Sequence, residues 1–298
     1  LYLNHLQLVF VDDCYMARGS GTCNFGMKQH SLKDALIRGC EFTDLQNGIS
    51  CGTNYSDCSD LSMTNVINED HWIHDIGLEN QGYGFLIGRV ADIMIRNCLF
   101  NDVHYTTSGK SAIAFDNNDS DDSGAIVRIL NNVFYDIEGP CLDIGSGVEN
   151  PPGTECDTLS TGVYYELIEV KNNIFYRTGV PGTDESFYEI SKTSDEAYIE
   201  SDYNCFYWGT SYDEFDNSFA VGGSALTHSL DTWQSVYGQD ANSIWDDPEF
   251  VRLTTPNFDV GSTSPCIDAG GTVKRSHDAI DQTERPVNSV WDIGAYEE

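Results

Sequence analysis

The sequence predicts an all-β fold, a right-handed parallel β-helix of stacked three-sided rungs with loop insertions and an irregular C-terminal cap. Three observations predict this solenoid. A pattern of about nine residues recurs along the chain, the repeats hold short β-branched runs, and Asn, Gly and Asp separate those runs. The repeats contain no amphipathic helical pattern, which argues against leucine-rich and βαβ architectures.

Each repeat reads apolar, polar, Asn or Gly, two variable residues, Phe, one variable residue, Asp, apolar. The repeats occupy residues 37–45, 68–76, 95–103, 129–137, 170–178 and 201–208. The Phe position holds Phe42, Ile73, Phe100, Phe134, Phe175 and Phe206, at intervals of 31, 27, 34, 41 and 31 residues. Equivalent positions in stacked parallel strands lie roughly 4.8 Å apart, so we expect these side chains to form one buried column.

The chain can be divided at the point where the last recognisable repeat ends. Residues 1–208 are predicted to form the rungs, and residues 209–298 to continue them and to cap the same domain. The chain opens in an apolar, strand-like run, which we interpret as the start of a mature or trimmed protein. Loop insertions rich in Gly, Ser, Asp, Asn and Pro are where solenoids tend to carry functional residues. They are residues 52–60, 104–111, 116–124, 145–163 and 179–186.

Acidic residues dominate the charge. There are 48 Asp and Glu against 15 Lys and Arg, a formal net charge of −33. Nucleic acid is not an expected partner, because phosphate binding needs clustered basic residues. A membrane span is not expected either, since no apolar stretch is long enough. The acid excess favours Ca²⁺, whose ligands are hard oxygens, and an extracellular or cell-surface setting in which salt screens self-repulsion.

The ten cysteines include three pairs that are close in sequence. These pairs are Cys14 with Cys23, Cys51 with Cys58, and Cys141 with Cys156. None has the spacing of a zinc site, so we expect three disulfides formed in an oxidising compartment, with buried free thiols as the alternative. Cys40 and Cys98 share a repeat position but lie two repeats apart, too far to pair.

The C-terminal segments resemble a known superfamily. Ser264-Pro-Cys-Ile-Asp-Ala-Gly270, Arg285-Pro286 and Asp292-Ile-Gly-Ala-Tyr-Glu297 look like the tail of right-handed parallel β-helix proteins of the pectate-lyase-like superfamily. Relatives often have Gly before the Arg-Pro pair, where this chain has Asp281-Gln-Thr-Glu284. The resemblance implies a structural tail that closes the open end of the helix through polar pairing. The pairing residues it implies are Asp268, Asp281, Arg285 and Asp292.

Two groups of carboxylates are candidates for Ca²⁺ binding. One is the Asp position of the repeat, occupied by Asp44, Asp75, Asp102 and Asp136; its simpler interpretation is that each Asp shapes its own turn. The other is the loop holding Asp116, Asp119, Asp121 and Asp122, which matches half of a calcium-binding loop but has Leu130 where an EF-hand has Glu. A solvated acidic loop is the alternative.

Catalytic candidates are few. β-Elimination of uronates, an activity that the resemblance implies for some members, needs a base and a group that neutralises the carboxylate. Arg96 is the first candidate, followed by His104 and Lys110, with His74 and Arg128 also near the middle rungs. The structural alternative is a salt-bridge ladder with Glu69 between Arg38 and Arg96.

Two functions of different classes follow. One is a secreted or cell-surface solenoid without catalysis. Such a solenoid is structural or adhesive, or it binds an extracellular polysaccharide or cell-surface glycan, and self-association is an additional possibility. The other is a Ca²⁺-dependent polysaccharide lyase or related enzyme on acidic glycans. The lyase constellations of the superfamily do not match residue by residue, which favours the first function.

Overall fold

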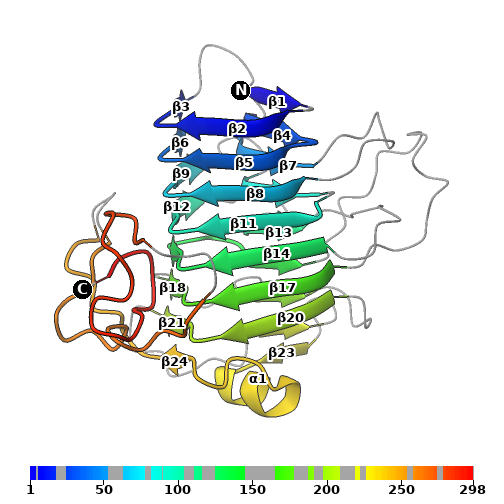
Figure 1. Ribbon diagram of the computed structural model, residues 1–298. Coiled ribbons are helices and arrows are strands. Elements are labelled where there is room, and N and C mark those ends of the chain that lie inside the picture. Colours follow the sequence, from blue (N-terminus) through cyan, green and yellow to red (C-terminus); the bar gives the residue numbers. More distant parts are fainter. Residues whose placement is uncertain are drawn as a thin grey trace.

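The computed structural model shows a right-handed parallel β-helix, in which three sheets form the faces of one stack (Figure 1). The structure describes residues 1–4, 6–17, 25–52, 63–77, 82–88, 90–103, 111–115, 125–144, 165–177, 187–190, 197–208, 219–221, 226–253, 258–273 and 278–297. The predicted fold class is thereby confirmed.

Each rung contributes one strand to each sheet. Sheet A runs in the order β1 (Tyr2–Asn4), β4 (Phe25–His30), β7 (Asn47–Cys51), β10 (Tyr83–Ile87), β13 (Ser111–Phe115), β16 (Leu142–Ile144), β19 (Tyr188–Ile190), β22 (Phe219–Val221) and β23 (Leu226–His228). Sheet B runs β2 (Gln7–Asp12), β5 (Lys33–Arg38), β8 (Thr64–Glu69), β11 (Asp92–Arg96), β14 (Ala125–Leu130), β17 (Tyr165–Lys171) and β20 (Ala197–Asp202). Sheet C contains β3 (Tyr15–Ala17), β6 (Glu41–Thr43), β9 (Trp72–Ile76), β12 (Leu99–Val103), β15 (Val133–Tyr135), β18 (Ile174–Arg177), β21 (Cys205–Trp208) and β24 (Ile244–Trp245).

The Phe position of the repeat forms the predicted column on the inner face of sheet C. Strand register places each member opposite the next, from Phe42 to Phe206, and all six side chains are buried. Ring centroids lie 4.8 Å apart for Phe100 and Phe134, 4.8 Å for Phe134 and Phe175, and 5.1 Å for Phe175 and Phe206. This stacking confirms the register that the sequence predicts.

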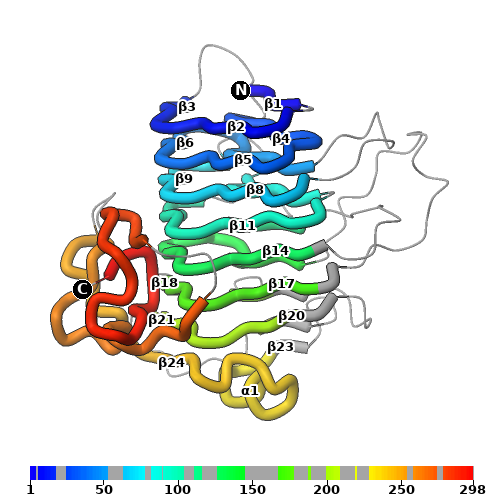
Figure 2. The backbone as a smooth tube through the Cα atoms, viewed as in Figure 1, coloured from blue at the N-terminus to red at the C-terminus, as the bar shows by residue number. Residues whose placement is uncertain are grey.

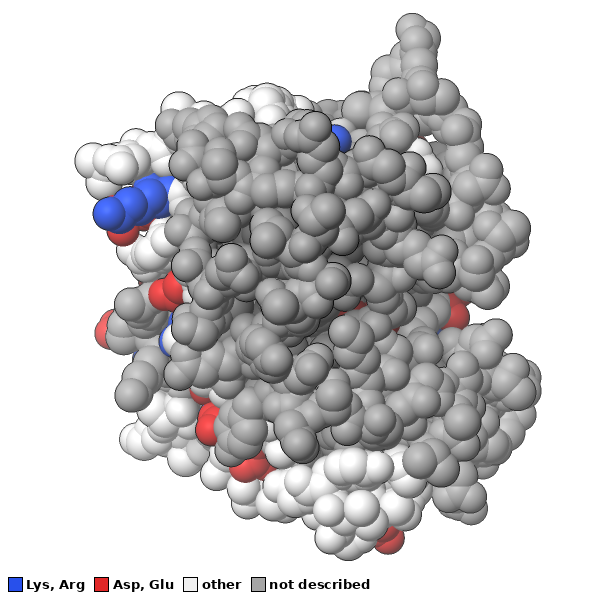
Figure 3. All heavy atoms as spheres, turned by 90° about the vertical axis from the view of Figure 1, so that its right-hand side faces the viewer, with Lys and Arg blue, Asp and Glu red and all other residues white. Residues whose placement is uncertain are grey.

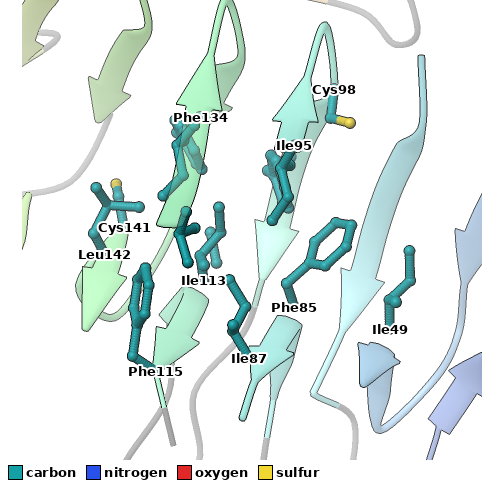
Figure 4. Packing of buried hydrophobic residues seen from close by; sticks show 14 of the residues in the cluster. Ile49, Phe85, Ile87, Ile95, Cys98, Ile113, Phe115, Phe134, Cys141 and Leu142 are labelled. Atoms are coloured by element: carbon teal, nitrogen blue, oxygen red, sulfur yellow. The ribbon is translucent and has the colours of Figure 1, made fainter. Parts of the chain in front are cut away.

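Sheet A supplies the opposite wall of the core. Its alternate residues point inward, and Figure 4 shows Phe85, Ile87, Ile113 and Phe115 in one cluster with Ile95 and Phe134. All four of these sheet A side chains are buried. The interior is therefore a continuous apolar filling from rung to rung, which is how a solenoid repeat without a core of its own becomes stable.

The turn from sheet B to sheet C explains why the repeat has Asn or Gly after its polar residue. The residues at this position all have a left-handed backbone, with φ between 50° and 63°. They are Asp13, Gly39, Asp70, Asn97, Asn131, Asn172 and Tyr203. Gly, Asn and Asp tolerate this conformation better than other residues, so the turn itself selects them.

The next residue in each turn joins the rungs. Asn132 Oδ1 accepts a hydrogen bond from Cys98 N at 2.9 Å, Asn173 Oδ1 one from Asn132 N, and Asn204 Oδ1 one from Asn173 N. His71 takes this role two rungs before Asn132, because its Nδ1 accepts from Cys40 N at 3.2 Å. Backbone groups at a buried corner are thus satisfied by the side chain of the following rung.

The C-terminal end of the stack is covered by a helix and a turn. Helix α1 (Leu230–Tyr237) begins at the Ser229 cap and buries Leu230 and Trp233. The Trp233 ring stacks on Phe219 of β22 at 5.0 Å, and its indole donates to Asp240 at 2.9 Å. No helix in the described ranges is long and apolar enough to cross a membrane.

The tail lies beside the stack and does not close its end, which corrects the expectation from the resemblance (Figures 1 and 2). Apolar tail residues such as Phe258, Val260 and Ile293 pack on the outer face of sheet C. Asn97 and Asn172 hold the tail by donating to Asp278 O and Gly271 O, both at 2.7 Å. The outward side chains of sheet C are apolar on the middle rungs, and covering them draws the tail to the side.

Polar pairing within the tail does occur as expected. Asp292 Oδ1 accepts from Asp268 N at 2.7 Å, and Asp281 Oδ1 accepts from Thr283 N at 3.0 Å. Arg285 is buried and donates to Gly294 O at 2.9 Å. These groups therefore shape the tail itself.

The cysteines depart from the predicted pairing. Cys14, Cys51 and Cys141 are free thiols, while Cys23, Cys58 and Cys156 lie outside the described residues. Cys51 and Cys141 are buried in the apolar core (Figure 4 shows Cys141). Strand alternation, and not closeness in sequence, decides which way these thiols point.

Candidate functional site

Of the three leading catalytic candidates and the four aspartates of the predicted Ca²⁺ loop, the structure places only one. Arg96 ends β11 on the outer face of sheet B. The other six lie outside the described residues; they are His104, Lys110, Asp116, Asp119, Asp121 and Asp122. The candidate site is therefore built from Arg96 and from the charged side chains on neighbouring rungs.

Arg96 is bound to a carboxylate of the preceding rung. Its Nε donates to Glu69 Oε2 at 2.6 Å, and its Nη2 contacts the same oxygen. The Arg96 side chain is 16% exposed and that of Glu69 9% exposed, so the pair is largely shielded from water. This is the pairing that the structural interpretation of the sequence expects. Arg96 can take a carboxylate of another molecule only by giving up Glu69.

The rest of the ladder differs in its partners. Arg38 pairs with Asp12, at 2.9 Å from Nε to Oδ1, and not with Glu69. Arg128 pairs with Asp92 at 2.6 Å and lies 3.5 Å from Glu169, which in turn pairs with Lys171 at 3.0 Å. Arg38, Arg96, Arg128 and Lys171, on β5, β11, β14 and β17, thus have carboxylate partners within the protein. Lys33, the exposed first residue of β5, forms no ion pair with a described residue.

Asp70 lies in the turn immediately after Glu69. Asn97 Nδ2 donates to its Oδ1 at 3.2 Å, and Gln282 Nε2 of the tail to its Oδ2 at 3.4 Å. The pKa of Asp70 is raised to about 7, chiefly by burial and next by the neighbouring charge of Glu69, while Asn97, Arg96 and Gln282 act in the opposite direction. A carboxyl group with such a pKa can exchange a proton near neutral pH.

A second cluster surrounds His74 on the outer face of sheet C. His74 Nδ1 lies 2.8 Å from Asp75 Oδ2, and Nε2 lies 3.2 Å from Glu41 Oε1. Thr43 Oγ1 lies 3.3 Å from Nδ1, and the Trp72 ring stacks on the imidazole at 3.8 Å. Two carboxylates at opposite ends of one imidazole fix the ring and can accept both of its protons.

Sequence reasoning noticed His74 but missed the cluster. Glu41 lies 33 residues before His74, and only the strand register of β6 and β9 brings the two together. The signal was present in the repeat, because Glu41 and Trp72 occupy the same position before the Phe column.

The Asp position of the repeat is explained by the backbone. Asp44, Asp75, Asp102 and Asp136 all have a left-handed backbone, with φ from 51° to 53°. Asp102 also accepts from Asn101 Nδ2 at 2.7 Å. In the part of the chain that the structure describes, no group of three or more His, Cys, Asp or Glu side chains is arranged to hold a metal ion.

Comparison with known proteins gives no relative. No protein family model matches the chain, and neither a curated protein nor a solved structure is similar to it at a significant level. The function must therefore be argued from the residues themselves.

Proposed function

We propose that this chain is a non-catalytic β-helix of the extracellular space or cell surface, with a structural or adhesive role or with a glycan as its ligand. The observation that carries this proposal is the outer face of sheet B, where Arg38, Arg96, Arg128 and Lys171 are each engaged by one of the protein's own carboxylates, and only the exposed Lys33 among the described cations of this sheet is not. Recognition of an anionic substrate for elimination needs a cation that is ready to pair with it.

The charge of the chain restricts which glycans it can bind. With a net charge of −33, the protein repels a polyuronate unless cations bridge the two. We therefore expect neutral glycans to bind without added metal, and acidic glycans only with Ca²⁺ present. The resemblance of the tail to the pectate-lyase-like superfamily supports a carbohydrate ligand by analogy alone.

Two measurements test this function. Ultraviolet absorbance detects unsaturated uronate, and we expect none from pectate or alginate with or without Ca²⁺, while an authentic lyase serves as positive control. Binding to immobilised neutral and acidic glycans is then measured in EDTA and in Ca²⁺. Release of unsaturated product by the wild-type protein would overturn the proposal.

The His74 cluster favours a second candidate, a polysaccharide lyase. In this alternative the imidazole is neutral, with its proton on Nδ1 toward Asp75, and Glu41 moves away from Nε2. Nε2 then accepts the proton from C5 of a uronate, the bond from C4 to the glycosidic oxygen breaks, and a C4–C5 double bond forms. The leaving oxygen takes its proton from water. Ca²⁺ supplies neutralisation of the uronate carboxylate when bound, and the Asp116–Asp122 loop stays the predicted place for it.

The enzyme candidate has its own matched variants. His74→Gln should abolish product formation if His74 is the base, whereas His228→Gln should not, because His228 lies at the other end of the stack beside Tyr237. Arg96→Ala, His104→Ala and Lys110→Ala test the residues that the sequence puts forward. Equal activity of wild type and His74→Gln would remove His74 from this role.

A further inference from the structure

Two buried cysteines meet where the tail covers the outer face of sheet C. Cys205 begins β21, and its side chain points outward, because the side chain of Phe206 beside it enters the core. On the three preceding rungs the strand register places apolar residues at the same outer position, namely Leu99, Val133 and Ile174. The apolar stripe that the tail covers therefore includes a thiol at β21, and Cys266 of the tail lies in the same cluster.

The two thiols contact each other. Both side chains are fully buried, and the Cys205 thiol is in hydrogen-bond contact with that of Cys266. The Cys205 Sγ also donates to Asp246 O at 3.3 Å. Two hydrogen bonds hold the backbone of Cys266, since its N donates to Ser264 Oγ at 3.1 Å and its O accepts from Ile293 N at 2.9 Å. Each thiol is thus fixed on its own side of the junction between the tail and the stack.

We propose that Cys205 and Cys266 form a disulfide that fastens the tail to β21 when the chain folds in the presence of a low-molecular-weight disulfide. The tail is otherwise held by apolar packing and by hydrogen bonds such as those that Asn97 and Asn172 donate. The two cysteines are 61 positions apart in the sequence, and a cross-link that closes so long a loop restricts the unfolded chain strongly. The bond keeps the outer face of sheet C covered when the weaker contacts open.

The reaction is a thiol–disulfide exchange in two steps. One cysteine loses its proton to the solvent, and its thiolate attacks a sulfur of the oxidant, so that a mixed disulfide forms and one small thiol leaves. The second cysteine, also as a thiolate, attacks the protein sulfur of the mixed disulfide and releases the second small thiol. The two protein thiols have then given two electrons and two protons to the oxidant, which has become two thiols.

Folding is the stage at which this reaction runs. Burial, and next the adjoining Cys266 thiol, raise the pKa of Cys205 well above its ordinary value, so that the seated thiol is rarely the reactive thiolate. Once formed, the bond is buried, and the net charge of −33 disfavours the approach of anionic thiols such as glutathione. Acidic side chains are visible at several places among the described residues of one face (Figure 3). We therefore expect the bond to resist reduction in the folded protein.

The bond does not depend on the proposed function. Disulfides persist in oxidising compartments, which agrees with the extracellular setting proposed above, but glutathione can form this one whatever the chain does. A glycan-binding measurement and a disulfide measurement can therefore fail separately.

Peptide mapping of the 298-residue chain tests the proposal. The chain is reduced in urea, refolded in a mixture of reduced and oxidised glutathione, and alkylated in urea without reductant before proteolysis. Mass spectrometry should find one peptide pair that is joined through Cys205 and Cys266 and that separates on reduction. Alkylated, unlinked Cys205 and Cys266 from the folded protein would overturn the proposal, and so would a link from either residue to another cysteine.

Melting temperature supplies a second measurement, taken as the difference between glutathione-refolded and fully reduced samples of each variant. In Cys266→Ala this difference should be smaller than in wild type by roughly 5 °C or more, because the cross-link is lost. Cys205→Ala should behave in the same way, and the double variant should show no further decrease. A cavity left by alanine lowers both samples and cancels in the difference.

Cys98→Ala is the matched control for these variants. Cys98 is also fully buried, but its thiol donates to Arg96 O. This variant should keep the wild-type difference in melting temperature. The proposal would be refuted if Cys205→Ala and Cys266→Ala kept that difference as well.

Discussion

Asn97 Nδ2 donates a hydrogen bond to Asp70 Oδ1 at 3.2 Å, although the two residues occupy the same left-handed turn position on neighbouring rungs. Asn131 and Asn172 have an amide at this position, whereas Asp70 places a carboxyl group there beside Glu69. The turn therefore accepts the shape of Asp70 but disfavours its negative charge.

Replacing this carboxyl group should stabilise the protein at alkaline pH. The pKa of Asp70 is about 7 in the folded chain and about 4 in an unfolded one, so its contribution to stability is full below pH 4 and is lost as pH rises through 7. We expect Asp70→Asn to raise the melting temperature at pH 8 and to change it little at pH 4. Asp44→Asn, at an exposed turn of the same backbone shape, is the control. A shift independent of pH would contradict the argument.

His71, which follows Asp70, should give stability the opposite dependence on pH. His71 is buried, and burial lowers its pKa to about 3, so its contribution is full above about pH 6.5 and is lost as pH falls toward 3. His71→Asn keeps an acceptor for Cys40 N, as Asn132 does for Cys98 N. We expect this variant to lose less stability between pH 7 and pH 4 than wild type.

The pH slope is the quantity to compare, because the smaller Asn leaves a cavity that lowers stability at every pH. Urea unfolding at pH 4, 5.5 and 7 measures it, with His228→Asn as a control at a more accessible histidine. Parallel slopes for wild type and His71→Asn would show that His71 does not limit acid stability.

The Phe column should be the most sensitive part of the core. Phe134 is fully buried, and its ring stacks on those of Phe100 and Phe175. Phe134→Ala should lower the free energy of unfolding by about 3–5 kcal/mol, and Phe134→Leu by about 1 kcal/mol, since Leu refills most of the volume. Urea titration followed by circular dichroism measures both. Equal losses for the two variants would mean that cavity volume does not set the cost.

Thiol reactivity should separate the described cysteines. Cys14 is only partly buried, whereas Cys40 and Cys141 are buried and burial raises the pKa of each to about 11. We expect brief alkylation of the native protein, followed by peptide mapping, to label Cys14 well before the other two. Labelling in urea should abolish the difference. Rapid native labelling of Cys141 would place that thiol outside the core.

The repeat carries enough information for the fold because its constraints are local. Phe, or Ile at position 73, enters the core at one position of each repeat. The left-handed turn three residues earlier holds Asn, Asp or Gly in every repeat except the one with Tyr203. A similarly local rule, the alternation of side chains along a strand, applies to the cysteines, although the prediction of disulfides relied on their spacing in the sequence. Ile49 and Cys51 alternate with Ser50 in β7, which already directs Cys51 into the core.

What depends on contacts between distant residues was not predictable from one sequence. The repeat aligns Glu41 with Trp72, but it does not show that the His74 ring is held between Glu41 and Asp75, because that depends on side-chain conformations on two rungs. The polar pairs of the tail were foreseen, but not its position, because docking depends on the apolar outer face of sheet C. From the sequence alone, the outward residues of sheet C show only the alternation of an ordinary strand, and nothing in that pattern identifies the tail as the segment that covers them.

Arg96 gives the last test, because its pairing bears on both stability and function. Glu69 is 9% exposed at its side chain, so Arg96→Ala leaves a nearly buried carboxylate without its guanidinium. We expect a loss of about 1–3 kcal/mol, more than the value below about 1 kcal/mol typical of an exposed pair. Arg38 does not compensate, since it is held by Asp12.

A double-mutant cycle with Glu69→Gln isolates the pair. The double variant should be more stable than Arg96→Ala alone, because Gln carries no charge to leave unpaired. Additive losses would show that Arg96 and Glu69 act independently. If the protein is a lyase that uses Arg96, Arg96→Ala should also abolish product formation. Glu69→Gln, which frees the guanidinium, should then retain product formation. In a non-catalytic solenoid, these variants change only the stability.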